Sequence, residues 1–313
     1  MLVLDNVSKS YQVGTFGGRE LRAVRDVTFT VPHGSVVSLI GESGSGKSTI
    51  GKMVLRLISV TSGTITLNGV DVSGLRRANL KDYYRNVQGV FQDPFSSYNP
   101  IYKVDHVFEV IRDGFFPGVG EAEWTRRVED ELANVRLDAA EILGKYPHQL
   151  SGGQLQRLLI ARALLLDIDY LVADEIISML DASTRIDVLN LLGDLKSRGL
   201  GILFITHDLS LGNYVSDRVV ILRRGAIVET GSTSAVFDNP LHPYTRKLLA
   251  SVPQLDRKWH VVEQELAARD AELGLDERCL YHEHHPDALP GLTEAGEDHL
   301  VGCFEVEGQC RLS

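Results

Sequence analysis

The sequence predicts an α/β fold in which buried strands carry functional loops at one edge of a sheet, and three observations support this prediction. A short apolar run, Val36–Ile40, leads into the glycine-rich segment Gly41–Gly46 and then into a helical pattern. Further apolar runs, such as Tyr170–Ala173, end in polar side chains, as strands of a buried sheet do. Residues 101–149 instead have a polar, helical composition rich in Glu, Arg and Ala. We therefore expect an α/β core with an inserted helical subdomain.

The first 35 residues alternate between apolar and polar side chains in short runs, which is typical of antiparallel strands. A glycine-containing loop at Gly14–Gly18 is expected to join these strands. Tyr11 lies in this region and is a candidate to stack on a nucleotide base, although spacing alone favours an ordinary strand aromatic. Residues 62–74 predict a hairpin that turns at Asn68-Gly69.

The segment Gly41–Thr49 matches the motif G-x-x-x-x-G-K-[ST] in its required strand–loop–helix context. Glycines allow backbone N–H groups to surround phosphate oxygens, and the N-terminus of the following helix adds a partial positive charge. Lys47 is expected on the β- and γ-phosphates, and the Ser48 hydroxyl on Mg²⁺. A glycine-rich turn that merely caps a helix is disfavoured, because motif and flanking elements agree. The predicted nucleotide-binding residues of the loop are Gly41, Glu42, Ser43, Gly44, Ser45, Gly46, Lys47, Ser48 and Thr49.

Three later strands are predicted to end in groups suited to phosphate chemistry. Gln92 follows the run Val87–Phe91 and is expected to reach Mg²⁺ or the attacking water. Asp174 is expected to hold Mg²⁺, while Glu175 polarises the water. His207 follows the buried run GILFIT and is expected to contact the γ-phosphate. The alternatives are a solvated acidic strand end and a structural histidine, and the position at the sheet edge favours the functional interpretation.

The remaining segments complete the core. The small residues Ser151, Gly152, Gly153 and Gln154 precede an amphipathic helical pattern that runs to Leu166, so they predict a second anion-binding helix end. Residues 185–199 predict another helix. A hairpin is expected to turn at Arg224-Gly225. From Ser232 onward the tail changes to Pro- and His-containing loops, a charged helix and a cysteine-bearing end.

Composition restricts the classes of function. The net charge of −10 disfavours a mainly electrostatic nucleic-acid binder, so no nucleic-acid partner is expected. No apolar stretch approaches the ~20 residues that span a bilayer. The start of the chain lacks the features of a secretory signal. The three cysteines all follow residue 278 and do not form the pattern of a secreted disulfide scaffold, which favours a cytosolic, reduced protein.

Together, these motifs resemble the nucleotide-binding subunit of an ABC transporter over roughly residues 1–235, and the sequence LSGGQ is highly specific to that superfamily. The resemblance implies a P-loop NTPase (RecA-like) core with an antiparallel β subdomain, a helical subdomain within 94–160 and a C-terminal extension at 236–313. It assigns Tyr11 to the A-loop, Gly41–Thr49 to Walker A, Gln92 to the Q-loop, Ser151–Gln154 to the signature, Asp174 and Glu175 to Walker B, Ser178–Asp181 to the D-loop and His207 to the switch.

A narrower resemblance rests on FQDPFSSYNP, on LHPYTRKLLASVP at 241–253 and on the tail, which are similar to the oligopeptide/dipeptide importer subfamily. It implies an ATPase at the cytoplasmic face of the cell membrane that uses ATP and Mg²⁺. Glu175, His207 and Lys47 would be its catalytic residues, Ser48, Gln92 and Asp174 would hold Mg²⁺, and Asp181 would lie in the D-loop. The implied partners are a second ABC ATPase subunit, two transmembrane permease subunits and an extracytoplasmic solute-binding protein. Relatives import peptides, nickel or oligosaccharides.

Two departures from the family pattern leave alternatives open. Ile176-Ile177 replaces the usual Pro-Thr after the Walker B glutamate, which favours a weaker site within an asymmetric ATPase pair as a second interpretation. A soluble, non-transport ABC ATPase is disfavoured, because the chain has neither a long coiled-coil insertion nor a second cassette. In the tail, Cys279 and Cys303 resemble half of an iron–sulfur motif, and Cys310 is additional; free thiols are the alternative to a cluster or another metal.

Overall fold

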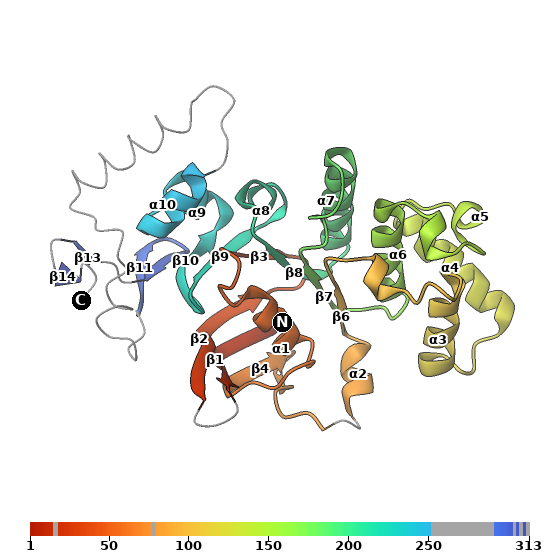
Figure 1. Ribbon diagram of the computed structural model, residues 1–313, viewed down its shortest axis with the longest axis horizontal. Coiled ribbons are helices and arrows are strands. Elements are labelled where there is room, and N and C mark those ends of the chain that lie inside the picture. Colours follow the sequence, from red (N-terminus) through yellow and green to blue (C-terminus); the bar gives the residue numbers. More distant parts are fainter. Residues whose placement is uncertain (15–17, 77–78, 252–290, 303–304, 307–308, 311–313) are drawn as a thin grey trace.

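The computed structural model describes residues 1–14, 18–76, 79–251, 291–302, 305–306 and 309–310. In this part of the chain, an eight-stranded sheet forms the centre of the molecule (Figure 1). Its strands, in spatial order, are β11 (Leu292–Gly296), β12 (His299–Gly302), β10 (Ala226–Ser232), β9 (Arg218–Arg223), β3 (Val36–Ile40), β8 (Gly201–Thr206), β7 (Tyr170–Asp174) and β6 (Val87–Val90). The run from β9 to β6 is parallel, whereas β10, β11 and β12 pair in antiparallel fashion. The predicted α/β core is confirmed.

The parallel strands are apolar on both faces, because helices cover both faces of the sheet. Alternate residues point to opposite sides: Val172 packs in one hydrophobic cluster and Leu171 in another. Helix α1 (Lys47–Val54) packs against β7 and β8 on the first side, together with the β subdomain. Helices α6 (Gly152–Leu164) and α7 (Ala182–Ser197) contribute to the cluster on the second side.

The antiparallel β subdomain consists of β1 (Leu2–Val13), β2 (Arg19–Val31), β4 (Ser62–Leu67) and β5 (Val70–Asp71), in the order β2-β1-β4-β5. The predicted hairpin turn is confirmed. Asn68 and Gly69 have φ values of 50° and 82°, and the left-handed conformation at both positions suits a tight turn between twisted strands. A short helix, α2 (Leu80–Tyr84), follows this subdomain.

The helical part of the chain lies between β6 and β7 and projects from the end of the sheet (Figure 1). It contains η2 (Phe95–Ser97), α3 (Asp105–Phe115), α4 (Glu121–Asn134), α5 (Ala139–Ile142), η3 (Pro147–Gln149) and α6. On α4, Trp124, Val128 and Leu132 repeat every four residues, which places them on one buried face. The prediction of an amphipathic α6 is wrong in one respect, because its residues are buried on nearly all sides between the sheet and neighbouring helices.

The C-terminal region adds to the core sheet. Helices α8 (Leu209–Val215), α9 (Thr233–Asp238) and α10 (Pro243–Ala250) form a third apolar cluster with β9 and β10. Strand β12 then pairs with β10, and β11 with β12. These two strands were not predicted from the sequence. A separate hairpin joins β13 (Glu305–Val306) and β14 (Gln309–Cys310). The predicted charged helix lies outside the described residues.

None of the helices in the described part of the chain is both long enough and apolar enough to cross a membrane.

Candidate functional site

Parallel pairing brings the ends of four strands to one edge of the sheet. Ile40 at the end of β3 is in register with Thr206 of β8, and Asp174 at the end of β7 is in register with Ile205. The phosphate loop, His207 and the Asp174-Glu175 pair therefore begin at the same edge. Gln92 follows β6, the next strand in the sheet, and its side chain is exposed. The edge predicted from the sequence is thus the edge that forms.

The phosphate loop is fixed by close backbone packing against β9. A Cβ atom at Gly41 would lie 2.2 Å from the Leu222 carbonyl oxygen, so only glycine fits there. Gly44 and Gly46 have φ values of 81° and 106°, which other residues rarely adopt. The amide of Ser45 donates to the Glu42 carbonyl at 3.2 Å. These constraints hold the loop above the start of α1, and the N–H groups of a helix N-terminus are suited to bind an anion.

Lys47 is the buried cation of this loop. Its Nζ donates to the carbonyl oxygens of Gly41 at 2.7 Å and Glu42 at 2.8 Å. Burial lowers the pKa of the ammonium, while the nearby carboxylates of Glu175 and Asp174 oppose that shift. The two carbonyls therefore orient a positive charge at the mouth of the loop before any phosphate arrives.

Asp174 and Ser48 form the pair best suited to Mg²⁺. The Ser48 hydroxyl donates to Asp174 Oδ1 at 3.2 Å, and burial raises the pKa of the Asp174 carboxyl. No group of three or more His, Cys, Asp or Glu side chains suited to a metal occurs among the described residues. Mg²⁺ does not need such a group, because it commonly takes one or two protein ligands and completes its shell with substrate phosphates and water.

Glu175 and His207 meet at the same edge. His207 Nδ1 lies 3.3 Å from Glu175 Oε1, and the Glu175 amide donates to the Ile205 carbonyl at 2.9 Å. Glu175 has a φ of 51°, a left-handed conformation that costs energy in a residue with a Cβ. Its side chain is 21% exposed and that of His207 is 58% exposed, so the carboxylate remains accessible to a water molecule.

Tyr11 lies on β1 opposite Leu21 of β2, and its ring is partly exposed. The Lys9 ammonium lies 5.3 Å from the ring centroid, within the range of a cation–π interaction. The Lys9 ammonium, from the same strand, therefore already occupies one position over the Tyr11 ring.

The signature residues occupy a different helix from the phosphate loop. Ser151 is the N-cap of α6 and forms a capping box with Gln154: the Gln154 amide donates to Ser151 Oγ, and the Ser151 amide donates to Gln154 Oε1. Helix α6 packs against β6, α4 and α7, whereas α1 packs against β7 and β8. The structure thus brings together Lys47, Ser48, Asp174, Glu175 and His207, but places the signature apart from them.

Asp181 has a local structural role. It is the N-cap of α7 and accepts hydrogen bonds from the Ser183 hydroxyl and from the amide and hydroxyl of Thr184. These bonds hold the pKa of its exposed carboxyl well below the usual range.

Comparison with known proteins identifies the family to which this arrangement of residues belongs. Residues 24–178 match the family described as ABC transporter, and residues 228–291 match the C-terminal region of oligopeptide/dipeptide transporters. A putative peptide import ATP-binding protein of Brucella ovis is 42% identical over 97% of both chains. The chain belongs to the ABC transporter family of ATPases. The oligopeptide transport ATP-binding protein OppF of Streptococcus pyogenes is 37% identical and covers 93% of this chain and 92% of its own.

Solved structures agree with this assignment. A dimeric ATP-binding cassette in a post-hydrolysis state with ADP and phosphate superimposes with a TM-score of 0.67, at 27% identity over 74% of this chain and 99% of that one. The structure of cbiO1 from Clostridium perfringens, at 23% identity, has the same fold with a TM-score of 0.67 over 84% of this chain and 98% of its own. The P-loop NTPase fold predicted from the sequence is confirmed, and the chain is an ATPase of this type.

The atypical Ile176-Ile177 in this ABC ATPase has a packing explanation. Both side chains are buried in the cluster formed with α6 and α7. The turn that follows Walker B still forms: the Ser178 amide and hydroxyl donate to the Glu175 carbonyl at 3.1 and 2.9 Å. Arg185 Nε closes the turn through the Leu180 carbonyl at 2.7 Å. Apolar packing and these hydrogen bonds therefore restrain the segment where the usual sequence has a proline.

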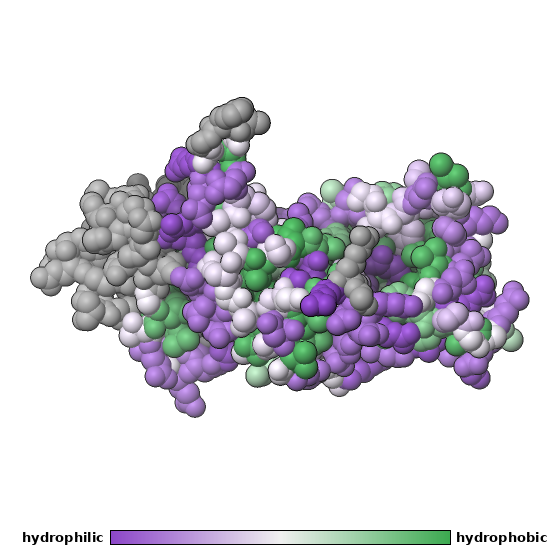
Figure 2. All heavy atoms as spheres, turned by 90° about the horizontal axis from the view of Figure 1, so that it is seen from below, coloured by the Kyte–Doolittle hydropathy of each residue, from purple (hydrophilic) through white to green (hydrophobic). Residues whose placement is uncertain are grey.

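An apolar groove that was not predicted from the sequence lies between the core and the helical part of this ATPase. Its lining includes Leu57, Phe91, Val110 and Phe115, and the exposed fraction is 55% for both Leu57 and Val110. In Figure 2, apolar side chains border this hollow between the β subdomain and the projecting helices. The apolar residues of α3 are visible in the sequence, but the sequence does not reveal that some of them are exposed.

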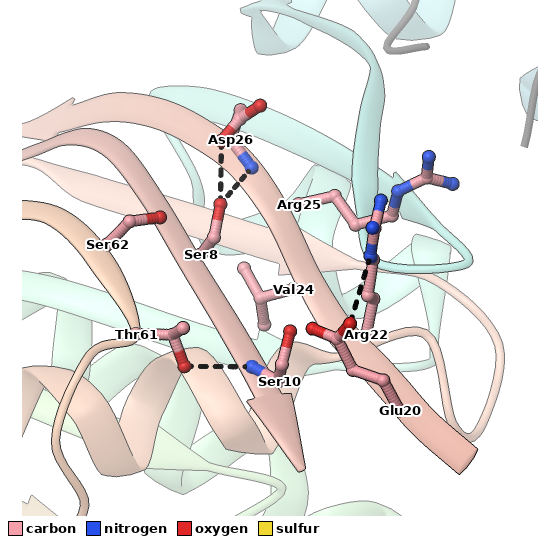
Figure 3. A pocket seen from close by; sticks show the side chains of 9 residues that line it. All are labelled: Ser8, Ser10, Glu20, Arg22, Val24, Arg25, Asp26, Thr61 and Ser62. Atoms are coloured by element: carbon pink, nitrogen blue, oxygen red, sulfur yellow. Dashed lines mark hydrogen bonds and ion pairs between the residues drawn. The ribbon is translucent and has the colours of Figure 1, made fainter. Parts of the chain in front are cut away.

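A second hollow lies on the β subdomain and is polar (Figure 3). Its lining groups pair with one another: Ser8 Oγ donates to Asp26 Oδ1 at 2.6 Å, and the Ser10 amide donates to Thr61 Oγ1 at 3.0 Å. No phosphate-loop residue lines it, so we do not include it in the nucleotide site.

Of the predicted metal ligands in the tail, Cys279 and Cys303 lie outside the described residues, and for Cys310 the structure describes only the backbone, in β14. His299, which the sequence places between Cys279 and Cys303, is described. It is buried, and its Nε2 lies 2.8 Å from Glu229 Oε1.

Proposed function

We propose that this ATPase powers an importer for peptides or related small solutes at the cytoplasmic face of the cell membrane. In this assembly it would act with a second ABC ATPase subunit, two permease subunits and an extracytoplasmic solute-binding protein. Relatives that align over nearly the whole chain are named as peptide import and oligopeptide transport proteins, which supports the peptide assignment, as does the match to the oligopeptide/dipeptide C-terminal region. Nickel and oligosaccharides remain candidate solutes from the sequence resemblance.

The observation that carries the proposed mechanism is the contact between Glu175 and His207 beside the buried Lys47. Lys47 neutralises charge on the β- and γ-phosphates of ATP. Glu175 accepts a proton from a water molecule as the water oxygen bonds to the γ-phosphorus, and the bond to the β-phosphate oxygen breaks to release ADP. His207 donates a hydrogen bond to the transferring phosphoryl group and orients the Glu175 carboxylate. Tyr11 stacks on the adenine base.

Ser48 and Asp174 would hold Mg²⁺, with Gln92 nearby at the end of the next strand. The hydroxyl and carboxylate already lie 3.2 Å apart, and a hard oxygen-ligand pair suits this ion. When bound, Mg²⁺ neutralises charge that develops on the phosphates. An iron–sulfur cluster or another metal at Cys279, Cys303 and Cys310 remains a prediction from the sequence; iron and sulfide analysis of anaerobically prepared protein tests it.

The separation of the signature from the phosphate loop supports a shared site. Ser151, Gly152, Gly153 and Gln154 would cover the ATP of a second subunit, while that subunit's signature covers the ATP on Lys47.

Such head-to-tail pairing leaves the apolar groove beside Gln92 available, and we assign it to a cytoplasmic helix of a permease. ATP drives transport through its higher affinity for the closed pair.

Replacement of Glu175 by Gln tests the catalytic assignment. The variant keeps a hydrogen-bonding side chain but loses the base, so we expect Mg·ATP to bind with nearly unchanged affinity while turnover falls at least ~100-fold. Calorimetric ATP titration and phosphate release, both on the full chain and on the assembled transporter, measure the two effects.

The same assay separates the alternatives. If the assembled transporter keeps its wild-type rate with Glu175→Gln, the interpretation as the weaker site of an asymmetric pair is correct and the proposed catalytic role is wrong. Peptide-stimulated phosphate release that depends on the permease subunits would exclude a soluble, non-transport ATPase.

A further inference from the structure

The C-terminal region of this chain contacts the phosphate loop directly. The Glu42 amide donates a hydrogen bond to Tyr244 Oη at 3.1 Å, although the two residues are 202 positions apart. Tyr244 lies on α10, and its side chain is buried in the cluster of α8, α9 and α10. The Arg223 guanidinium lies 5.1 Å from the ring centroid, which adds a cation–π contact. The hydroxyl is therefore held in place by the packing of its own ring.

The peptide group that Tyr244 holds is the one that orients Lys47. The Gly41 carbonyl and the Glu42 amide belong to a single planar unit, and in a trans peptide they point in opposite directions. Lys47 Nζ donates to this carbonyl at 2.7 Å, while Tyr244 Oη accepts from the amide. Rotation of the peptide about the chain would break both hydrogen bonds at once. Tyr244 thus restrains one of the two carbonyl groups that hold the lysine ammonium.

The support for Tyr244 continues to the last strands of the core sheet. His242 is the N-cap of α10, and its Nδ1 accepts from the Tyr244 amide at 3.0 Å. Buried Glu229 on β10 fixes the preceding backbone: its carboxylate accepts from the amides of Leu241 at 2.8 Å and His242 at 3.1 Å. His299 of β12 contacts the same carboxylate at 2.8 Å. A chain of close contacts therefore joins β12 to the phosphate loop.

We propose that Tyr244 is a positioning residue for Lys47, and that Glu229 and His299 anchor it through the start of α10. The C-terminal region then does more than extend the sheet, because it sets the geometry of the phosphate site. The proposal rests on the proposed role of Lys47 in binding the phosphates of ATP. It assigns no new contact with the nucleotide to Tyr244, which acts through the Gly41–Glu42 peptide.

Tyr244→Phe in the full chain tests the proposal, because it removes only the accepting hydroxyl and keeps the ring on Arg223. We expect the Kd for Mg·ATP to rise about three- to tenfold, as for the loss of one partly buried hydrogen bond. KM should rise by more than kcat falls, because Tyr244 does not touch the water or Glu175. Tyr214→Phe is the matched control, since it removes a hydroxyl that donates to Asn190 at 2.9 Å on the exposed surface.

A double-mutant cycle tests the anchor. His299→Gln alone should weaken Mg·ATP binding by a smaller factor, and in the Tyr244→Phe background it should add little. Additive effects would overturn the anchoring role of His299, and unchanged ATP affinity in Tyr244→Phe would overturn the positioning role. A purely structural Tyr244 would lower thermal stability and leave Kd and KM unchanged. A wild-type chain that binds no Mg·ATP would overturn the proposed function and this inference with it.

Discussion

Asp174 illustrates how a residue in the site opposes the stability of the free protein. The residue is 8% exposed, and burial raises the pKa of its carboxyl above the ordinary value of 3.8. The nearby cations Lys52 and Lys47 lower this pKa but do not compensate for the burial. The ionised form is therefore the costly one in the folded state, and it is also the form that we propose to hold Mg²⁺.

We predict that Asp174→Asn stabilises the free protein while it abolishes Mg²⁺-dependent hydrolysis. The pKa of Asp174 is higher in the folded protein than in the unfolded chain. The neutral carboxyl therefore favours the folded state at low pH, and this stability is lost as the pH rises through the folded-state pKa. At neutral pH, the free energy of unfolding should therefore increase by about 1 kcal/mol in the variant. The gain should disappear as the pH falls toward 4. Denaturant unfolding at several pH values without nucleotide measures it.

Asp181→Asn is the matched control for this prediction. The hydrogen bonds from Ser183 and Thr184 lower the pKa of Asp181, so its ionised form is favoured in the folded state. The same substitution should therefore lower stability at neutral pH, with the loss shrinking as the pH falls below the ordinary carboxyl range. If both variants change the free energy of unfolding in the same direction at neutral pH, the explanation from burial of Asp174 is wrong.

Individual residues of the site were predictable where a motif or a strand end marked them. Lys47 and Ser48 follow from the motif, and Glu175 and His207 from their positions after buried strands. Tyr244 was not predicted as part of the site, although its run LHPYTRKLL was noted. Its role depends on a contact across 202 residues, and no local pattern encodes such a contact.

At the scale of elements, short apolar runs were good predictors of the central strands. Strands β3, β7 and β8 are buried at every position, and their sequences are apolar apart from Ser38, Asp174 and Thr206. Strands β11 and β12 were missed because β11 is mostly exposed and its sequence, LTEAG, lacks that pattern. What defines them is the pairing of β12 with β10 and of β11 with β12, which only the folded chain provides.

The apolar groove leads to a prediction at the same scale. Val110 of α3 lies in the groove with 55% of its surface exposed, so Val110→Glu should change the free energy of unfolding by no more than ~0.5 kcal/mol. The charge should nevertheless prevent an apolar permease helix from docking. Co-purification of the chain with its membrane subunits measures the effect, and we expect it to be lost.

Ile101→Glu is the control, because Ile101 is 76% exposed and does not line the groove. It introduces the same charge on the same part of the chain and should leave co-purification intact. If both variants assemble normally, the groove is not the permease site.

At the scale of the whole molecule, the two helices whose N-termini we propose to bind phosphate cover opposite faces of the core sheet. Helix α1 and its loop belong to the side of the sheet that carries the β subdomain, whereas α6 packs with α4 and α7 on the other side. The sequence shows that both helix ends exist. It does not show that they are separated, because this depends on which face of the sheet each helix covers.

A mixing experiment tests whether each ATP is shared between two chains. Lys47→Ala removes the phosphate-loop cation, and Ser151→Arg places a bulky side chain on the exposed N-cap of α6, so each variant alone should hydrolyse almost no ATP. If two copies pair head to tail, a mixed pair has one site with both defects and one site with neither. An equal mixture should then recover roughly a quarter of the wild-type rate, since about half of the pairs are mixed and each has one intact site. Wild-type activity in Ser151→Arg alone would contradict the shared site. No recovery, with Mg·ATP still bound by the Ser151→Arg chain, would show that its partner is a different cassette rather than a second copy.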